Sequence, residues 1–495
     1  MYNLSFEEFV NLQGKGNLIP LYKEIIADTE TPITAYLKLK EESSYLLESV
    51  EHGEFGRYSF LGLKCHALVS CKDQQLIIRD SQGNITETYR TDNPLLSLKE
   101  ILADYKVVET SGLPPFYGGA VGYLGYNCIK YFEEVPQQAI DDQKMPEMMF
   151  MISDTVLVFD HLYHSIKIVS NIKVDRGKED YQEAVNKIED ISKKLEMTRL
   201  FETDKEPDIN RKIGKNIKSN ISKDDYIDSV YRAKEYIEEG DIFQVVLSQR
   251  FEIPVKVPSF NIYRQLRRIN PSPYMYYFDF AEFQIVGSSP ELLVRVKDGK
   301  IENRPIAGTR KRGCDSAEDE RLSLDLLADE KERAEHIMLV DLGRNDIGKV
   351  SRYGSVKAAR LMDVEYYSHV MHMVSDLQGE LKEGEDIYSA LEACFPAGTV
   401  SGAPKIRAME IIDRLEKTNR GPYAGTIAYF GYSGNLDSCI AIRTMVIKEG
   451  KAFIQAGGGI VADSNPEAEY QETINKAQAL IKAIELAERG CRILS

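Results

Sequence analysis

The sequence predicts an α+β protein, and two patterns carry that prediction. Between residues 33 and 160, short runs of β-branched and aliphatic residues are separated by Gly, Asn and Asp, which are typical of turns between strands. From residue 222 onward, apolar runs with strand character alternate with segments whose apolar residues are spaced as on one face of a helix. We therefore expect a sheet-rich first part and a mixed second part.

The length of the chain predicts two domains, or one very large one. Its 495 residues are 43% hydrophobic and 28% charged, a globular composition at a length beyond which a single core usually stops growing. A charged stretch from Glu202 to Lys223 contains few apolar residues and marks the predicted boundary. The first domain is predicted over 1–205, ending in a helix from Asp180 to Leu195, and the second over 222–495.

Elements of the second domain follow in order along the chain. Ser222 is a typical N-cap, and the apolar residues after it are spaced for a helix that ends at Gly240. Residues 243–251 then have the composition of a strand. Further strands are predicted over 274–280, 284–296, 424–432 and 441–447, and helices over 259–269, 328–342 and 466–489.

Charge and cysteine content exclude several classes of protein. The formal net charge of −16 repels phosphate backbones, so we expect no nucleic-acid partner, and an anionic substrate must meet local positive charge. The seven cysteines are scattered and never form a C-x-x-C pair, which indicates reduced thiols. The N-terminus lacks the pattern of a signal peptide, and no apolar stretch is long enough to span a membrane. We therefore expect a cytoplasmic protein.

Two glycine-containing segments are candidate anion sites. Residues Pro305–Arg310 place a glycine beside a hydroxyl and an arginine, so that backbone N–H groups can face an anion. Residues Gln455–Ile460 contain three consecutive glycines, which bring bare backbone close to whatever lies opposite. The alternatives are an ordinary turn at a strand end and a flexible hairpin. Neither segment continues as G-x-G-x-x-G or G-K-[ST], which argues against a dinucleotide or nucleotide triphosphate.

Acidic residues in two predicted helices are candidate magnesium ligands. Glu469 and Glu472 lie three residues apart on one face of the last helix, and Glu335 ends an acidic run in an earlier helix. Such acids usually complement the helix dipole or form a solvated face. Here each acidic turn adjoins an apolar segment, and Mg²⁺ needs only one or two carboxylates when water and substrate fill its other positions.

Other reactive residue types fit no known catalytic pattern. His336, His369 and His372 have no zinc-ligand spacing, and each alone is more typical of a hydrogen-bonded core or surface histidine. Residues Phe395–Lys405 combine two glycines, two prolines, two hydroxyls and a lysine, as expected for a shaped loop over a site. Neither a G-x-S-x-G segment nor a glutaminase cysteine elbow is present, so the sequence does not support hydrolysis by a serine or thiol nucleophile.

Taken in order, five segments resemble the chorismate-binding enzyme family. They are Pro305–Arg310, Glu335–Asp346, Phe395–Lys405, Gln455–Ile460 and Glu469–Glu472, and the resemblance covers about residues 222 to 489. It implies large mixed or antiparallel β-sheets packed in a sandwich with helices outside. It also implies an enzyme that acts on chorismate, a small dianionic acid, and that uses Mg²⁺.

The resemblance implies a role for each matched residue. Glu335 and Glu472 are expected to hold Mg²⁺ against the ring carboxylate, with Glu469 supporting them. Tyr423 and Arg443 are expected to hold the enolpyruvyl carboxylate. The remaining residues expected to line the pocket are Gly308, Thr309, Gly457, Gly458 and Gly459.

The reacting ring is matched by three further residues. Glu291 is expected to protonate the departing 4-hydroxyl, since burial raises the pKa of a carboxyl toward neutrality. Its alternative is a carboxylate at a strand edge. His372 and Thr399 match neighbours of the ring.

Two positions distinguish among the family's reactions. Aminodeoxychorismate synthases carry a nucleophilic lysine where this chain has Ala307, and isochorismate and salicylate synthases carry a basic lysine where it has Gln244. A site without either lysine suits ammonia, which adds at C2 as hydroxide leaves C4, before pyruvate is lost and anthranilate forms. The alternatives are an aminodeoxychorismate synthase component or another chorismate-utilising enzyme.

The resemblance further implies a partner and a regulator. No glutamine amidotransferase domain is present, so a separate amidotransferase subunit is expected to deliver ammonia. Leu46–Ser49 and Asn270–Met275 resemble two walls of a tryptophan pocket, which makes the first domain regulatory. The residues concerned are Glu48, Ser49, Pro273, Tyr274 and Met275. The alternatives are an ordinary strand end or turn at these residues, and a catalytically silent subunit that senses tryptophan or acts as a scaffold.

Overall fold

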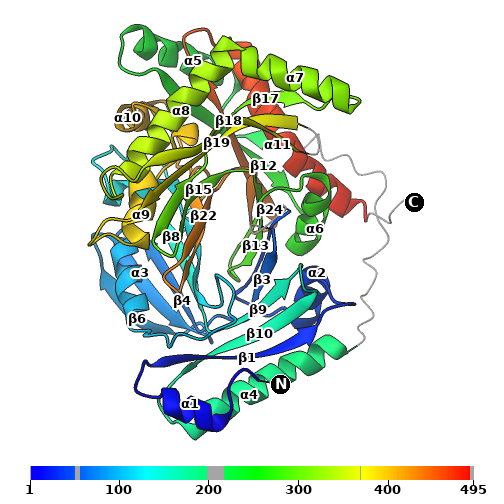
Figure 1. Cartoon of the computed structure of the whole chain (residues 1–495). Coiled ribbons are helices and arrows are strands. Elements are labelled where there is room, and N and C mark those ends of the chain that lie inside the picture. Colours follow the sequence, from blue (N-terminus) through cyan, green and yellow to red (C-terminus); the bar gives the residue numbers. More distant parts are fainter. Residues whose placement is uncertain (1, 51–55, 198–216, 368–369, 491–495) are drawn as a thin grey trace.

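The computed structural model describes residues 2–50, 56–197, 217–367 and 370–490, and these form two twelve-stranded sheets with helices outside them (Figure 1). Pairing between the named strands is antiparallel throughout, as in β13 and β14. An apolar cluster lies between the sheets and joins Phe278 of the first sheet to Met151 of the second. The predicted fold class, a sandwich of large sheets covered by helices, is confirmed.

The first sheet runs in the order β1 (Leu18–Ile26), β10 (Ser165–Lys173), β9 (Thr155–Asp160), β3 (Tyr58–Gly62), β2 (Ser44–Glu48), β13 (Tyr274–Asp279), β14 (Gln284–Ser289), β23 (Thr444–Lys448), β24 (Lys451–Ile460), β12 (Gln244–Pro254) and β11 (Lys218–Ser219), and β20 (Gly402–Ala403) also pairs with β12. The second sheet runs in the order β17 (Ile306–Lys311), β19 (Val370–Glu380), β16 (Lys300–Asn303), β15 (Leu292–Lys297), β22 (Leu436–Ile440), β21 (Thr426–Gly431), β7 (Gly119–Leu124), β8 (Met148–Ser153), β4 (Ala67–Lys72), β5 (Gln75–Asp80) and β6 (Ile85–Arg90), and β18 (Lys357–Tyr366) also pairs with β19.

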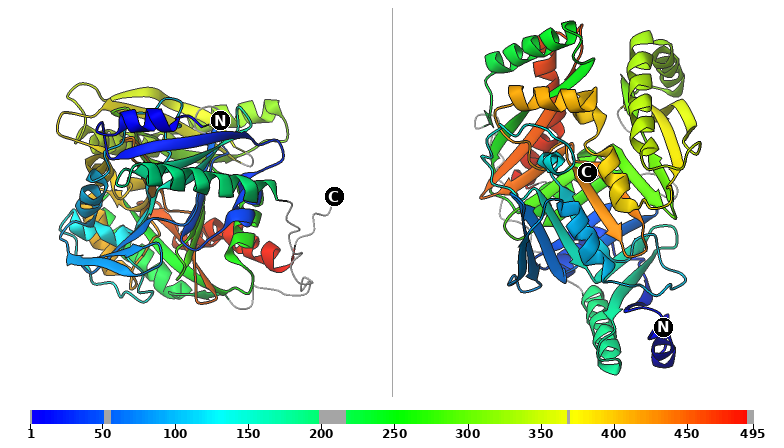
Figure 2. Two further views of the ribbon diagram at one scale, coloured as in Figure 1. Left: turned by 90° about the horizontal axis from the view of Figure 1, so that it is seen from below. Right: turned by 90° about the vertical axis from the view of Figure 1, so that its left-hand side faces the viewer.

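The helices cover the outer faces of both sheets. They are α1 (Phe6–Leu12), α2 (Pro32–Leu39), α3 (Pro94–Ala103), α4 (Lys178–Glu196), α5 (Lys223–Glu238), α6 (Ser259–Ile269), α7 (Ser316–Ala328), α8 (Glu330–Gly348), α9 (Ile387–Cys394), α10 (Lys405–Leu415) and α11 (Pro466–Glu488), with 3-10 turns η1 (Tyr126–Tyr131) and η3 (Gly398–Val400). Helices α6 and α11 pack on the first sheet, whereas α8 and α9 pack on the second. Figure 2 shows α1 and α4 at the end of the molecule opposite α7 and α8. Among the described helices, none is both long and apolar enough to cross a membrane.

Both predicted domains contribute strands to both sheets. Leu46 of β2 pairs with Tyr277 of β13, and Gly122 of β7 pairs with Ala428 of β21. Most of the predicted boundary stretch, residues 198–216, lies outside the described residues. The division of the chain at 205–222 stays a prediction, but the two segments share their sheets and hydrophobic clusters rather than folding around separate cores.

Local patterns located five of the eleven α-helices in the described part of the chain, namely α4, α5, α6, α8 and α11. The predicted helix over 180–195 is α4, and Ser222 caps α5, where its Oγ accepts a hydrogen bond from the Asp225 N–H at 3.1 Å. The apolar face predicted for α5 is buried at Tyr226, Val230 and Ala233. These segments carry strong helical periodicity, which is why single-sequence reasoning finds them.

One predicted strand is two strands in different sheets. Residues 284–296 divide into β14 in the first sheet and β15 in the second, with Pro290 and Glu291 between them. Proline has no N–H to donate to a ladder, so pairing stops at this position. The chain therefore crosses from one sheet to the other at Glu291, which the sequence analysis did not foresee.

Candidate active site

A cavity of about 610 Å³ opens between the two sheets, and residues of β12, β24 and α11 line it together with residues of β17 and α8. Residues far apart in the sequence meet in its wall. The predicted residues that line it are Gln244, Glu291, Gly308, Thr309, Glu335, Thr399, Tyr423, Arg443, Gly457, Gly459, Glu469 and Glu472. The five segments that carried the resemblance thus belong to one place in the fold, and a cavity of this size accommodates a small organic acid.

Two predicted residues lie just behind the wall. His372 of β19 is half-buried, and its Nδ1 lies 3.0 Å from Thr309 Oγ1 and 3.1 Å from the Gly308 carbonyl oxygen. Burial lowers the pKa of His372. Gly458 is next to the acidic cluster, since a Cβ built there would lie 2.9 Å from Glu469 Oε2. His369 lies outside the described residues.

The glycines of β24 make room for the cavity. They belong to a strand and not to a hairpin turn, because Gly457 and Gly459 pair with Ser248 and Val246 of β12. A Cβ added at Gly457 would lie 2.7 Å from the Tyr423 hydroxyl, and one at Gly459 would lie 2.4 Å from Gln244 Nε2. Any side chain at these positions would push Tyr423 or Gln244 out of place.

Gly308 also shapes the cavity, because the pairing of β17 with β19 is irregular at this residue. The register between β17 and β19 shifts between Ala307 and Thr309, and Gly308 in the shift has a φ of +69°. A left-handed conformation of this kind favours glycine. The segment predicted to end a strand is therefore an irregularity inside one, and it leaves Thr309 exposed at the edge of the cavity.

Acidic side chains concentrate at one end of the cavity. Burial and the neighbouring carboxylates of Glu332 and Glu472 raise the pKa of Glu335. Burial also raises the pKa of Glu469, although Ser464 Oγ donates a hydrogen bond of 2.7 Å to its carboxylate. Carboxylates that repel one another in a partly desolvated place fit a divalent cation, which would relieve the repulsion.

The donor set at this end is one that Mg²⁺ accepts. Glu335 comes from α8 and Glu472 from α11, and both line the same cavity. Among the described residues, no group of three or more His, Cys, Asp or Glu side chains is arranged to hold a metal ion. Two carboxylates completed by water and by an anionic substrate match the preference of Mg²⁺ for oxygen ligands and retained water.

Cationic side chains line the same cavity and fit an anionic ligand. Arg443 is half-buried in the wall, and burial lowers the pKa of its guanidinium group. Tyr423 lies close to Arg443, and burial raises the pKa of its hydroxyl to about 12, so that it stays protonated and can donate a hydrogen bond. Lys476 and Lys331 also line the cavity. These groups supply the local positive charge that an anionic substrate needs in order to bind to an acidic protein.

Lys476 was missed by the sequence analysis. Its Nζ lies 2.6 Å from Glu472 Oε1 and donates a hydrogen bond of 2.9 Å to the Gly457 carbonyl oxygen. The signal that reveals it is its spacing, because it follows Glu472 by one helical turn and therefore shares that face of α11.

Glu291 lies where the chain crosses between the sheets, and only part of its side chain is exposed, toward the cavity. Burial raises its pKa to about 7, and the nearby Thr399 hydroxyl opposes that shift. Its backbone is fixed, since its carbonyl oxygen accepts a 3.0 Å hydrogen bond from the Ile440 N–H. A carboxyl group that is still partly protonated at neutral pH can act as a general acid.

Known proteins with similar sequences agree with this geometry. Residues 4–482 match the family described as chorismate binding enzyme. The chain belongs to this family.

Two relatives are similar over almost their whole length. Anthranilate synthase component 1 of Acetivibrio thermocellus is 52% identical over 98% of this chain and 99% of its own length. That of Aquifex aeolicus is 50% identical over 99% of both. The crystal structure of anthranilate synthase component I from Streptococcus pneumoniae TIGR4 superposes with a TM-score of 0.77 at 38% identity and covers 92% of this chain and 98% of its own. The predicted resemblance is confirmed, and the protein is an enzyme that acts on chorismate.

Within this chorismate-binding enzyme, the two positions at which the resemblance implies a lysine in other members line the active-site cavity. Ala307 is buried in the wall formed by β17, and Gln244 is buried at the start of β12. The Oε1 atom of Gln244 has no hydrogen-bond partner among the described residues. Neither side chain can act as a nucleophile or as a base at neutral pH.

A buried ion pair that the sequence analysis also missed supports the wall from behind. Arg420 pairs with Glu416 at 2.6 Å and donates hydrogen bonds to the carbonyl oxygens of Val246 (2.7 Å) and Val400 (2.8 Å), both cavity residues. Its guanidinium carbon lies 5.7 Å from the centre of the Tyr423 ring. One arginine thus holds β12, η3 and Tyr423 together.

The five residues predicted for tryptophan binding meet in a second pocket. Met275 pairs with Glu48 across β13 and β2, which brings the two predicted walls together. The pocket, here called the regulatory pocket, is lined by Leu47, Glu48, Ser49, Tyr58, Phe60, Pro273, Tyr274, Met275, Tyr276, Arg295, Ile427, Ala428, Tyr429, Asp437 and Cys439. Glu48 is buried at its edge, where Tyr263 donates a 2.6 Å hydrogen bond to it and Arg267 pairs with it at 3.0 Å. Aromatic rings with a carboxylate beside them suit an amino acid with an aromatic side chain. The role of these residues stays a prediction.

Proposed function

We propose that the protein forms anthranilate and pyruvate from chorismate and ammonia, and that it is the large subunit of an anthranilate synthase. The observation that carries this proposal is a cavity that contains a partly buried acid, Glu291, but neither of the lysines that the resemblance assigns to other members as nucleophile or base. Similarity over nearly the full length to proteins named anthranilate synthase component 1 supports it.

Substrate binding follows from the charges that line the cavity. Arg443 and Tyr423 present donors for the enolpyruvyl carboxylate, and the glycines of β24 leave room for it. The ring carboxylate lies toward Glu335 and Glu472. These two residues would hold Mg²⁺, which when bound supplies positive charge that neutralises and orients that carboxylate.

The chemical step needs a nucleophile and an acid. The nitrogen of ammonia bonds to C2, the ring π electrons shift, and the C4–O bond breaks. Glu291 gives its proton to the departing oxygen, so that water leaves instead of hydroxide. The C3–O bond then breaks as the C2 proton is lost and the methylene carbon of the departing enolpyruvate gains a proton. This releases pyruvate and leaves the aromatic ring of anthranilate. Gln244 and Ala307 take no part in proton transfer.

A separate glutamine amidotransferase subunit is proposed as the source of ammonia. Free ammonia is scarce near neutral pH because most of it is ammonium, so the reaction needs a local source. The designation component 1 of the relatives supports the existence of a second component.

We further propose that tryptophan fills the regulatory pocket and inhibits the reaction. A cytoplasmic location is proposed from the six described cysteines, all of which are free thiols.

The decisive experiment combines chorismate, an ammonium salt and Mg²⁺, and follows anthranilate by its fluorescence. Formation of anthranilate that stops when Mg²⁺ is chelated supports the proposal, and absence of any product overturns it. Glu335→Gln and Glu472→Gln are expected to lose at least 100-fold in turnover, whereas Glu467→Gln, an exposed residue in the first turn of α11, serves as the control. A silent sensor would be indifferent to all three substitutions.

Two further measurements test the alternatives. A 4-amino product detected by mass spectrometry would identify an aminodeoxychorismate synthase component instead. The chain contains 28 tyrosines but no tryptophan, so the fluorescence of added L-tryptophan, excited at a wavelength that tyrosine does not absorb, reports its binding without background from the protein. Saturable binding that is lost in Glu48→Gln supports the regulatory pocket as its site.

A further inference from the structure

Tyr274 contacts the chain on both sides of Glu291. Its backbone pairs with Ser289 in the first sheet, two residues before Glu291. Its hydroxyl oxygen accepts a hydrogen bond of 2.8 Å from Arg295 Nη2 in the second sheet, four residues after Glu291. The segment from Ser289 to Arg295, which carries the buried acid, is therefore closed into a loop by one tyrosine of the regulatory pocket.

Arg295 is held firmly enough to transmit a displacement. It pairs with Asp437 at 3.0 Å, and the two residues are directly opposite in β15 and β22. On the other side, Glu302 of β16 is opposite Arg295 and lies 3.7 Å away. Tyr274 also donates a hydrogen bond of 3.0 Å to Asp437. Only 13% of the Arg295 side chain is exposed, so these charge-assisted bonds are little screened by solvent.

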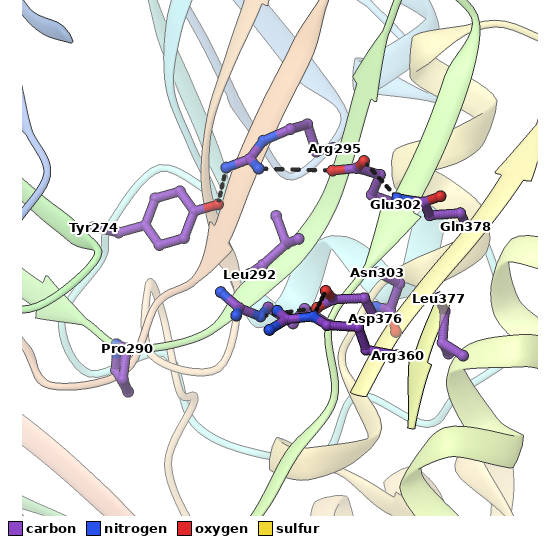
Figure 3. Close-up of a pocket in the computed structure, with 11 residues that line it drawn as sticks. Tyr274, Pro290, Leu292, Arg295, Glu302, Asn303, Arg360, Asp376, Leu377 and Gln378 are labelled. Carbon is purple, nitrogen blue, oxygen red and sulfur yellow. Dashed lines mark hydrogen bonds and ion pairs between the residues drawn. The ribbon is translucent and has the colours of Figure 1, made fainter. Parts of the chain in front are cut away.

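A small cavity lies between the regulatory pocket and the active site (Figure 3). Its volume is about 170 Å³, and Figure 3 shows Arg295 pointing toward the Tyr274 hydroxyl on one side while Pro290 lies on another. Tyr274 and Arg295 line both this cavity and the regulatory pocket, and Pro290 lines both this cavity and the active site. The three cavities are consecutive, with shared walls.

The small cavity gives the crossing segment room to move. Close-packed interiors resist displacement, whereas side chains at a void lack contacts on one side. Pro290 and Leu292, which flank Glu291, both face the void. A shift of Tyr274 can therefore move the segment without compressing a packed core.

We propose that occupation of the regulatory pocket controls catalysis through the hydrogen bond between Tyr274 and Arg295, which sets the position of Glu291. This inference rests on the proposed function, since it names how that function is regulated. Arg295 is a positioning residue, because it reaches Glu291 only through the backbone of β15. Coupling between two sites is a difference in free energy between two arrangements, and the bond at Tyr274 is the element that both sites share.

The test measures inhibition at saturating tryptophan, so that a weakened affinity does not resemble a loss of coupling. For each variant, the fluorescence titration gives the dissociation constant, and the ammonia-dependent rate is then measured at about 20 times that concentration. We expect Tyr274→Phe, which keeps the ring but loses the hydroxyl, and Arg295→Lys to retain at least five times the fractional activity of the wild type. Tyr429→Phe is the matched control, since it lines the same pocket and its hydroxyl bonds to no side chain among the described residues.

A second readout separates positioning from general destabilisation. Tryptophan should displace the falling limb of the pH profile of kcat in the wild type, because it moves the acid, but should leave that limb unchanged in Arg295→Lys. Full inhibition of both variants at saturation, with the same displacement as in the wild type, overturns the inference while the proposed function stands. A wild type that makes no anthranilate overturns both.

Discussion

The ammonium group of Lys476 lies 2.6 Å from the carboxylate of Glu472, one turn earlier on α11. The same ammonium donates to the carbonyl oxygen of Gly457 in β24. The lysine thus joins the acidic end of the active-site cavity to its glycine wall. The cavity must accept the two carboxylates of chorismate. Lys476 supplies positive charge at the end of the cavity where the proposed Mg²⁺ ligands lie.

Removing this charge should weaken chorismate binding. We expect Lys476→Gln to raise the KM for chorismate about tenfold or more, since a hydrogen bond to a charged group contributes about 1.5–3 kcal/mol. Lys482→Gln, an exposed lysine two turns further along α11 that pairs with Glu485, is the control and should leave KM unchanged. Steady-state kinetics at saturating ammonia measure both, and an unchanged KM in Lys476→Gln would show that the substrate lies elsewhere.

The protonation state of Glu291 should make kcat decrease as the pH rises. Burial raises its pKa to about 7, so the proportion of the protonated acid decreases as pH rises through that value. With free ammonia held constant at each pH, kcat should therefore fall by about tenfold per unit above pH 8. A profile that stays flat from pH 6 to 9 would exclude Glu291 as the proton donor.

The same raised pKa predicts a pH-dependent gain in stability for Glu291→Gln. A carboxyl whose pKa is higher in the folded state favours folding when protonated, and that contribution is lost as pH rises through about 7. Above this pH the wild type carries a charge in a partly buried place. The neutral amide should therefore raise the free energy of unfolding by roughly 1–3 kcal/mol at pH 8.5, and by less at pH 5.5. Urea titrations at the two pH values measure it, and equal gains at both would contradict the linkage.

How far the sequence predicts this protein depends on the range over which its signals act. Helices α5 and α11 follow from caps and apolar spacing, which are local. That Glu335 and Glu472 line one cavity could be predicted only from the resemblance, because no periodicity relates two helices that are so far apart in the sequence. The crossing at Glu291 was missed because residues 284–296 read as one apolar run, although Pro290 was there to mark the break.

Several side-chain contacts could not be predicted from the sequence. Arg420 and Glu416 look in the sequence like an ordinary surface pair four residues apart, yet they are buried behind the cavity wall. Arg295 and Tyr274 carry no local pattern that relates them. They meet because β13 pairs with β14 in the first sheet and the chain then crosses into β15 of the second sheet. Sheet register is a long-range property, so the side chains that it places opposite one another appear only in the structure.

Sheet register also explains why the glycines of β24 should tolerate no side chain. At Gly457, a Cβ would lie 2.8 Å from the Leu247 carbonyl oxygen, a backbone atom that cannot swing away, and 2.7 Å from the Tyr423 hydroxyl. We expect Gly457→Ala to lower kcat/KM for chorismate at least tenfold, because Tyr423 must leave its position beside Arg443. Gly348→Ala, at the end of α8, is the control, since a Cβ there meets nothing within 4 Å. Steady-state kinetics and thermal unfolding of the two variants test this prediction. Loss of activity with retained folding in Gly457→Ala supports the assignment of this wall to substrate binding. Full activity in Gly457→Ala would contradict that assignment.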